Sequence, residues 1–232
     1  MTLAEQILKL ERDLCRLSKE DKKFASSLVE QYANRGFLSD KQIPWVEHLL
    51  NRCRGLPVEK TFVGDFSGVL KLFETAGKAL NHPKITLAVD DLTVVLSVAG
   101  PYSKAPGTVN VTDGGGFGTS LWFGRVETTG MWTPGLKPSK ETLGKVKGLL
   151  TRLAESPAET AATYGKLTGR CCFCNGKLTD NKSLAAGYGP TCAKNFGLAD
   201  KWKAASSLPA MKTLTEYKNP EDNPYYRASR GY

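Results

Sequence analysis

The sequence predicts a mixed α+β protein: an N-terminal helical bundle, a small antiparallel β-rich middle with flanking helices, and a C-terminal zinc knuckle like a treble clef. Three observations lead to this fold class. Apolar residues recur at helical spacing in the first third, β-branched runs follow, and four of the six cysteines lie within residues 171–192. We expect four parts: a helical region over 1–58, an α+β domain over 59–165, a zinc-knuckle module over 166–203 and a flexible tail over 204–232.

Three helices are expected in the N-terminal region. Thr2 and Glu5 have the spacing of a capping box, and leucine and isoleucine follow at helical intervals as far as residue 17. Ser18 can cap a second helix that Gly36 ends, because glycine readily adopts the left-handed conformation that closes a helix. A third helix is expected from about residue 39 to residue 55, with Pro44 in its first turn.

The middle of the chain begins with a helix and then changes to strands. A helix is expected over 67–80, where the apolar residues keep helical spacing. Two β-branched runs follow, at 84–89 and 92–99, and Asp90-Asp91 joins them as a hairpin.

A second hairpin is expected from the runs at 108–112 and 119–127, with the glycine-rich segment 113–118 at its tip. That segment precedes a strand and lacks the Lys-Ser/Thr pair of a phosphate-binding loop, so we interpret it as a turn. Residues 130–138 are rich in proline and glycine and are expected to be a connector. Two helices should follow, over 139–153 and 157–164.

The cysteines carry the clearest chemical signal. Cys171 and Cys174 have the two-residue spacing that lets two thiolates bind one metal ion from a single turn. Cys192 follows Pro190, which is well placed to open a helix whose N-terminal dipole favours a thiolate. We expect Cys171, Cys174 and Cys192 to bind Zn²⁺ (zinc) in a structural site. Such a site holds a small fold together and offers no open position for an activated water.

The fourth zinc ligand stays open at this point. Cys172, His48 and His82 are candidates, and Asn195 stands where a further cysteine would complete a second C-x-x-C pair. Two other interpretations of the cysteines remain, a set of buried reduced thiols and a reactive Cys172 whose thiolate the basic surroundings would favour.

The charge of the chain indicates an anionic partner. The net charge is +9 and the pI is about 9.2, which places nucleic acid first among the possible partners. Seven basic residues gather in the cysteine region and are expected to contact phosphates: Lys166, Arg170, Lys177, Lys182, Lys194, Lys201 and Lys203. Phosphate contacts carry no sequence information, so we expect little sequence preference.

Aromatic residues of the predicted hairpins offer a second mode of contact. They lie near Lys104 and Arg125, where they either stack on unpaired bases or belong to the core. The residues concerned are Tyr102, Phe117, Trp122, Phe123 and Trp132.

No catalytic constellation is recognisable. The chain has two histidines and lacks the H-E-x-x-H and H-x-E patterns of zinc hydrolases, which predicts a non-catalytic protein. No run approaches the roughly 18 apolar residues of a membrane span, and the N-terminus lacks the apolar core of a signal peptide. We therefore expect a cytoplasmic location.

The stretch from Cys171 to Cys192 reads as a C-x-x-C turn, then Leu178-Thr179-Asp180, Ser183, and finally Gly187-Tyr188-Gly189-Pro190 before the last cysteine. In this pattern, residues 168–198 resemble a small zinc-knuckle family of unknown function found mainly in bacteriophage and bacterial proteins. The resemblance implies a phage-type accessory protein with three prominent cysteines, and it implies no established activity.

The expected function is therefore that of a phage-type accessory protein that binds nucleic acid without catalysis. The alternative is an adapter or inhibitor that docks on a host enzyme through protein–protein contacts, with its helical N-terminal region as the docking face. The strand type of the nucleic acid and the oligomeric state stay open.

Overall fold

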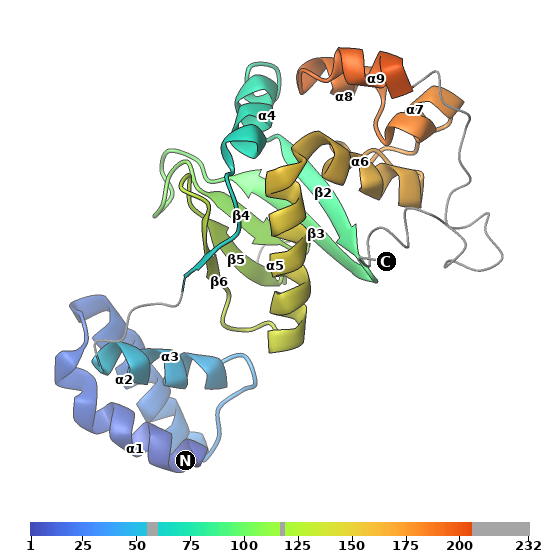
Figure 1. The fold of residues 1–232 in the computed structure, drawn as a ribbon. Helices are drawn as coiled ribbons and strands as arrows, with labels where there is room; N and C mark the ends of the chain where they lie inside the picture. The colour runs from blue at the N-terminus through green and yellow to red at the C-terminus, as the bar shows by residue number, and fades with distance from the viewer. Residues whose placement is uncertain (55–59, 117–118, 206–232) are drawn as a thin grey trace. The chain divides into compact units, whose positions relative to one another are not determined.

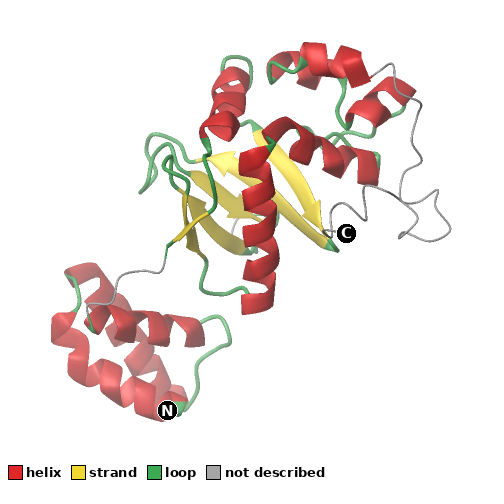
Figure 2. Ribbon diagram, viewed as in Figure 1, coloured by secondary structure: helices red, strands yellow, loops and turns green. Residues whose placement is uncertain are grey.

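The protein is described here from a computed structural model, which covers residues 1–54, 60–116 and 119–205. The chain divides into two compact units, Met1–Lys60 and Thr61–Tyr232. Helices and one antiparallel sheet make up the fold, so the predicted mixed α and β class is confirmed (Figures 1 and 2). Of the expected tail over 204–232, only residues 204 and 205 belong to the described part, where they end the last helix.

The first unit is built from three α-helices, α1 (Leu3–Asp13), α2 (Lys19–Arg35) and α3 (Ile43–Cys53). Their apolar faces meet in one core made of Ile7, Leu10, Ala25, Leu28, Leu38, Val46, Leu49, Leu50 and Cys53. The capping box at Thr2 and the left-handed Gly36, with φ of 75°, are both present, as their residue types predicted. The first helix ends at Asp13, and a 3₁₀ turn over Leu14–Arg16 replaces its expected last turn.

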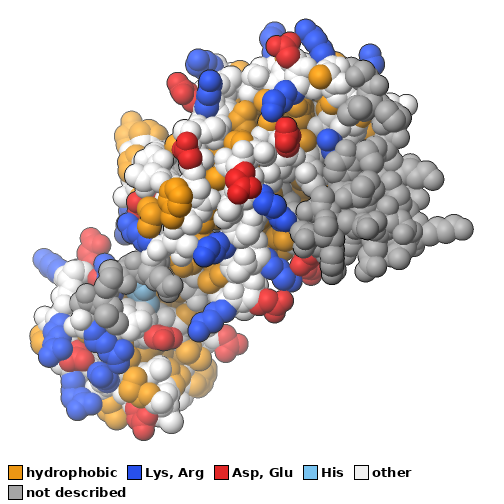
Figure 3. All heavy atoms as spheres, viewed as in Figure 1, with side chains coloured by type: hydrophobic (Ala, Val, Ile, Leu, Met, Phe, Trp, Pro, Cys, Tyr) orange, Lys and Arg blue, Asp and Glu red, His pale blue; other side chains and the backbone are white. Residues whose placement is uncertain are grey.

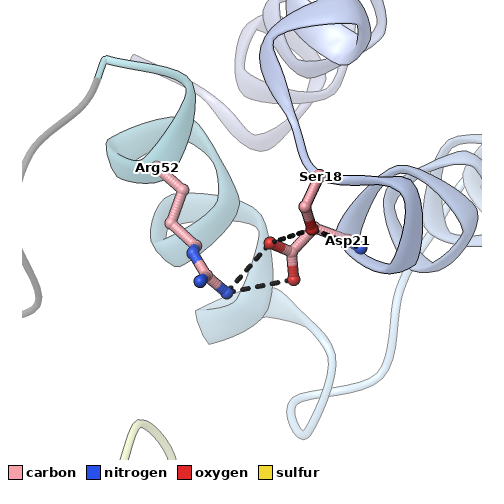
Figure 4. Close-up of polar contacts among 3 residues, drawn as sticks. All are labelled: Ser18, Asp21 and Arg52. Atoms are coloured by element: carbon pink, nitrogen blue, oxygen red, sulfur yellow. Dashed lines mark hydrogen bonds and ion pairs between the residues drawn. The ribbon is translucent and has the colours of Figure 1, made fainter.

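A polar cluster fastens the start of α2 to α3 (Figure 4). The Ser18 hydroxyl donates to a carboxylate oxygen of Asp21 at 2.9 Å, and the Asp21 amide donates back to the hydroxyl at 3.2 Å. A guanidinium nitrogen of Arg52 lies 3.0 Å from either carboxylate oxygen of Asp21. The N-cap of one helix is thus tied by charge to a neighbouring helix.

The second unit contains a six-stranded antiparallel sheet with the order β1-β6-β5-β4-β3-β2. Its strands are β1 (Thr61–Phe62), β2 (Lys84–Val89), β3 (Leu92–Val98), β4 (Val109–Thr112), β5 (Trp122–Val126) and β6 (Met131–Pro134). The two predicted hairpins are present and pair with each other through β3 and β4. The connector prediction for 130–138 is wrong in part, because β6 pairs with β5 and also with the very short β1.

Six helices of the described residues accompany the sheet: α4 (Ser67–Gly77), α5 (Lys140–Glu155), α6 (Pro157–Thr168), α7 (Asn181–Ala186), α8 (Pro190–Asn195) and α9 (Ala199–Ala205). In Figure 1, α5 crosses in front of the sheet and α6 continues from it toward α7. Leu150 and Leu153 of α5, with Val69 of α4 and Ala161 of α6, share one core with buried strand residues such as Leu96.

The two faces of the sheet differ. Ile85, Leu96, Val111 and Val126 are fully buried in the shared core. Because side chains alternate along a strand, their neighbours lie on the opposite face. That second face carries mainly polar or partly exposed residues.

Candidate metal centre

Three cysteine sulfurs gather at one point of the second unit. The Sγ atoms of Cys171, Cys174 and Cys192 all lie within 4.8 Å of one another. Cys171 and Cys174 come from a short hairpin that Arg170 and Lys177 close as a β-bridge, and Cys192 is the third residue of α8. The sequence prediction that these three residues form one group is confirmed.

The donor set fits a zinc ion. Zinc binds thiolates at about 2.3 Å, so sulfurs around a tetrahedral ion are about 3.8 Å apart, within the spread of this cluster. The hydrogen bond with the Cys192 thiol, assisted by the amides of Cys174, Phe173 and Gly189, lowers the pKa of Cys171 to about 5 although burial acts to raise it. The same hydrogen bond and burial raise the pKa of Cys192. The cluster therefore already stabilises one thiolate, the form that binds a metal.

The hairpin has the backbone geometry that brings its two cysteines together. The Cys171 amide donates to the Gly176 carbonyl at 2.8 Å, and the Asn175 amide donates to the Cys171 carbonyl at 2.9 Å. The residue with positive φ in this turn is Asn175, at 59°, and not the neighbouring glycine. The hydroxyl of Tyr164 on α6 donates to the Asn175 side-chain oxygen at 2.9 Å, which holds the turn against that helix.

Cys172 joins the hairpin to the sheet. Its carbonyl accepts a hydrogen bond from the Thr86 amide of β2 at 2.6 Å, and its side chain is completely buried. Burial raises the pKa of the Cys172 thiol well above its usual value. A buried neutral thiol is a poor nucleophile, so this placement argues against the reactive-thiol interpretation. Cys172 is not part of the three-sulfur group.

An aromatic cluster packs the module onto the main core. Phe173 stacks on Phe196 with ring centroids 3.8 Å apart, and its ring lies 5.4 Å from that of Tyr188. All three side chains belong to the core that also contains the buried strands. The expected ranges 59–165 and 166–203 therefore share one hydrophobic core.

The backbones of α6 and of the segment after α7 touch directly. A Cβ atom on Gly165 would meet the Gly187 carbonyl, and a Cβ on Gly187 would lie 2.8 Å from the carbonyl carbon of Ala162. Gly187 also has φ of 82° and ends α7 in the left-handed conformation. No local sequence pattern explains these glycines; the small residues around Gly165 are the signal of a close helix contact that the sequence offers.

The other candidate ligands lie elsewhere. Among the described residues, no histidine or carboxylate joins the three sulfurs. His82 lines an open groove of about 830 Å³ beside α4, and His48 packs edge-on against Trp45 at 5.6 Å. Burial, and secondarily Arg52, lower the pKa of His48.

The seven predicted phosphate contacts fall into two groups. Lys201 lies 4.0 Å from Glu159, and Lys203 lies 3.8 Å from Asp200, so both have acidic neighbours. Figure 3 likewise shows basic and acidic side chains interspersed on the face that it presents. Lys166 is half-buried on α6.

The remaining four basic residues are exposed around the cysteines. Arg170 donates to the Asn175 carbonyl at 3.1 Å, and Lys177 stands directly opposite it across the hairpin. Lys182 is in α7 and Lys194 in α8. Within the described ranges, none of these four side chains pairs with a carboxylate.

Comparison with known proteins finds one similarity, which covers the cysteine module. Residues 161–197 match a family of unknown function, DUF6011. The match runs from α6 through the cysteine hairpin to the end of α8, so it contains the three sulfurs and the Gly165–Gly187 contact. No curated protein and no solved structure matches the chain. None of the helices in the described ranges has the length and apolar character needed to cross a membrane.

Proposed function

We propose that the cysteine group binds one Zn²⁺ ion and that hairpin and helix together form a treble-clef knuckle. The proposal is supported by the convergence of three sulfurs from a C-x-x-C hairpin and a helix. The ion would link the hairpin to α8 and so fix the surface that both present. We assign the ion a structural role, because all three ligands would be thiolates and no histidine or carboxylate of the described residues joins them to act as a general base.

We further propose that the protein is a phage-type accessory protein that binds nucleic acid without catalysis and with little sequence preference. The observation that carries this proposal is the pair Arg170 and Lys177. Residues directly opposite in an antiparallel bridge place their side chains close together, and two like charges there are unfavourable unless an anion lies between or beside them. A phosphate group supplies that anion.

Two further cations of the cysteine module are also exposed. Lys182 and Lys194 are exposed on the neighbouring helices α7 and α8, and neither pairs with an acid in the described part of the chain. Backbone phosphates are recognised by cations of this kind without reading the bases. We therefore expect affinity to depend on salt more than on sequence.

The test is fluorescence anisotropy with labelled DNA and RNA, single- and double-stranded, over a salt series. Each lost phosphate contact lowers the slope of log affinity against log salt by about one. Arg170→Ala and Lys177→Ala are each expected to weaken binding and lower that slope. Lys78→Ala, which removes an equal charge next to α4, is the matched control and should change neither. The absence of binding at low salt would refute the proposal.

The second candidate is an adapter or inhibitor that binds a host enzyme, and a specific feature of the first unit favours it. Phe37 is 64% exposed and Leu8 is 59% exposed, while Phe24 and Ile43 are also exposed. A small unit that exposes several large apolar side chains suits a protein partner. This function predicts capture of a host protein that Phe37→Glu abolishes and that competing DNA leaves unchanged.

A further inference from the structure

The second face of the sheet carries an ordered array of side chains, and the loop after β4 covers part of it where Gly114 meets Val95. Strand register places Lys84 of β2 and Arg125 of β5 in one cross-strand row, separated by Ser97 and Asn110. Residues that follow one another in such a row point to the same side. Neighbouring strands lie about 4.8 Å apart, so the Cα atoms of Lys84 and Arg125 are about 14 Å apart across the sheet.

Trp122 stands in the next row of the same face. It pairs with Thr112, which pairs in turn with Val95. A bulge between Val111 and Thr112 shifts the register, so that Phe123 enters the core with no exposure while Trp122 remains 38% exposed. Rows two residues apart are separated by about 7 Å, which puts the indole next to Arg125.

A second aromatic residue lies at the far edge of this face. Phe62 of β1 pairs with Met131, whose neighbour Trp132 is buried in the core, and Phe62 is 61% exposed. Four large apolar side chains are exposed in the described part of this unit, and two of them, Phe62 and Trp122, belong to this face. Exposed aromatics on a sheet face whose other residues are mainly polar need an explanation that the core does not supply.

The charges of the face favour an anionic ligand. Neither Lys84 nor Arg125 pairs with an acidic residue in the described part of the chain. Acidic residues lie at the margins of the face. Glu127 follows β5 and already has an interaction of its own, and Asp113 follows β4 and accepts hydrogen bonds from the Ser120 hydroxyl and the Leu121 amide. Glu74 lines the same groove as Lys84. Two available cations, with the ring of Trp122 beside Arg125 and that of Phe62 at the far edge, match a chain of phosphates with unpaired bases.

We propose that this sheet face binds single-stranded nucleic acid, with Trp122 stacking on a base, Arg125 holding the phosphate next to it and Lys84 holding a phosphate farther along the strand. The inference rests on the proposed nucleic-acid function and adds the strand type and a second surface. A base pair in a duplex hides its faces, so the tryptophan contributes only when bases are unpaired. Phe123 and Trp132, both candidates for stacking from the sequence, are core residues instead. Phe117 lies outside the described residues.

The experiment compares variants of the full chain by anisotropy with labelled oligothymidylate, oligouridylate and a DNA hairpin duplex. Trp122→Ala is expected to weaken binding to single strands about tenfold, because one base loses its stacking partner. Trp122→Phe keeps an aromatic ring and should retain most of the affinity. Phe37→Ala, which removes an exposed aromatic residue of the other unit, is the control and should have no effect. The oligouridylate arm distinguishes RNA from DNA.

Two further readings make the test decisive. Arg125→Gln should weaken single-strand binding and lower its salt slope, and thermal unfolding of each variant must match the wild type. The inference is overturned if Trp122→Ala binds single strands as tightly as the wild type does. It is also overturned if this variant loses as much affinity for the duplex as for single strands. If Trp122→Ala changes nothing while Arg170→Ala weakens duplex binding, the sheet surface is rejected and the proposed function stands. Absence of all binding by the wild type rejects both.

Discussion

Replacing Gly187 by alanine tests the contact that joins the cysteine module to α6. Gly187 ends α7 with φ of 82°, a conformation that costs an alanine about 1–2 kcal/mol. Its added Cβ would lie 2.9 Å from the Ala162 Cα and closer still to the carbonyl, whereas ordinary contacts are 3.4–4 Å. The helix must therefore move by more than half of an ångström at this point, and forced repacking of this kind costs about 1–3 kcal/mol. We expect Gly187→Ala to lower the free energy of unfolding by about 2–5 kcal/mol.

Gly189 provides a matched control two residues away. Its φ is −80° and a Cβ there would meet no atom within 4 Å. Alanine is the poorer N-cap by about 1 kcal/mol, but it loses less conformational entropy than glycine on folding, which returns about 0.4–1 kcal/mol. Gly189→Ala should therefore change the free energy of unfolding by less than about 1 kcal/mol.

The assay is urea denaturation of the metal-loaded protein, followed by circular dichroism and by tryptophan fluorescence. A large destabilisation by Gly187→Ala with a near-neutral Gly189→Ala confirms the close contact. Gly165→Ala adds an independent reading, because alanine improves helix propensity by about 1 kcal/mol and yet would collide with the Gly187 carbonyl. Equal stability of the two variants Gly187→Ala and Gly189→Ala would refute the argument from backbone contact.

Three further predictions concern other parts of the chain. Cys192→Ser should abolish binding of one Zn²⁺ per chain, measured by elemental analysis, whereas Cys15→Ser, an exposed cysteine of the other unit, should leave it intact. Arg52→Gln should lower the stability of the first unit by about 0.5–1 kcal/mol, seen as a lower urea midpoint, because it removes the partly exposed ion pair with Asp21. Burial acts to raise the pKa of Asp113, but hydrogen bonds that end at its carboxylate outweigh burial and hold the pKa below its usual value. The stability that ionised Asp113 contributes is therefore present above the unfolded pKa of about 3.9 and is lost as the pH falls through the lower folded pKa. Asp113→Asn cannot ionise, so its melting temperature should fall less than that of the wild type over this acid range.

Local signals were enough to predict much of the fold. Ser18 and Gly36 lie at the two ends of α2, as predicted, because helix capping and left-handed closure depend on nearby residues only. The three-cysteine group was predictable for the same reason, since C-x-x-C spacing fixes two ligands on one turn and Pro190 fixes the start of the helix that carries the third.

The features that sequence analysis missed depend on distant partners. β1 is two residues long and exists because Thr61 and Phe62 pair with β6, which no local pattern reveals. The same holds for the aromatics. Trp122 and Phe123 are adjacent and similarly apolar, and only the bulge in the β4–β5 pairing decides which one faces the core.

The like-charged pair of the hairpin has one competing explanation, and it can be separated from phosphate binding. Three thiolates with one Zn²⁺ carry a net charge of −1, and Arg170 and Lys177 lie on the hairpin that supplies two of those thiolates. If the two cations served only to balance this charge, removing either would weaken metal binding and leave the affinity for nucleic acid unchanged after zinc is restored. If they contact phosphates, Lys177→Ala keeps its zinc content under chelator competition and loses nucleic-acid affinity with a lower salt slope. The chemistry favours the second result, because Arg170 already directs its guanidinium to the Asn175 carbonyl, and Lys177 is exposed.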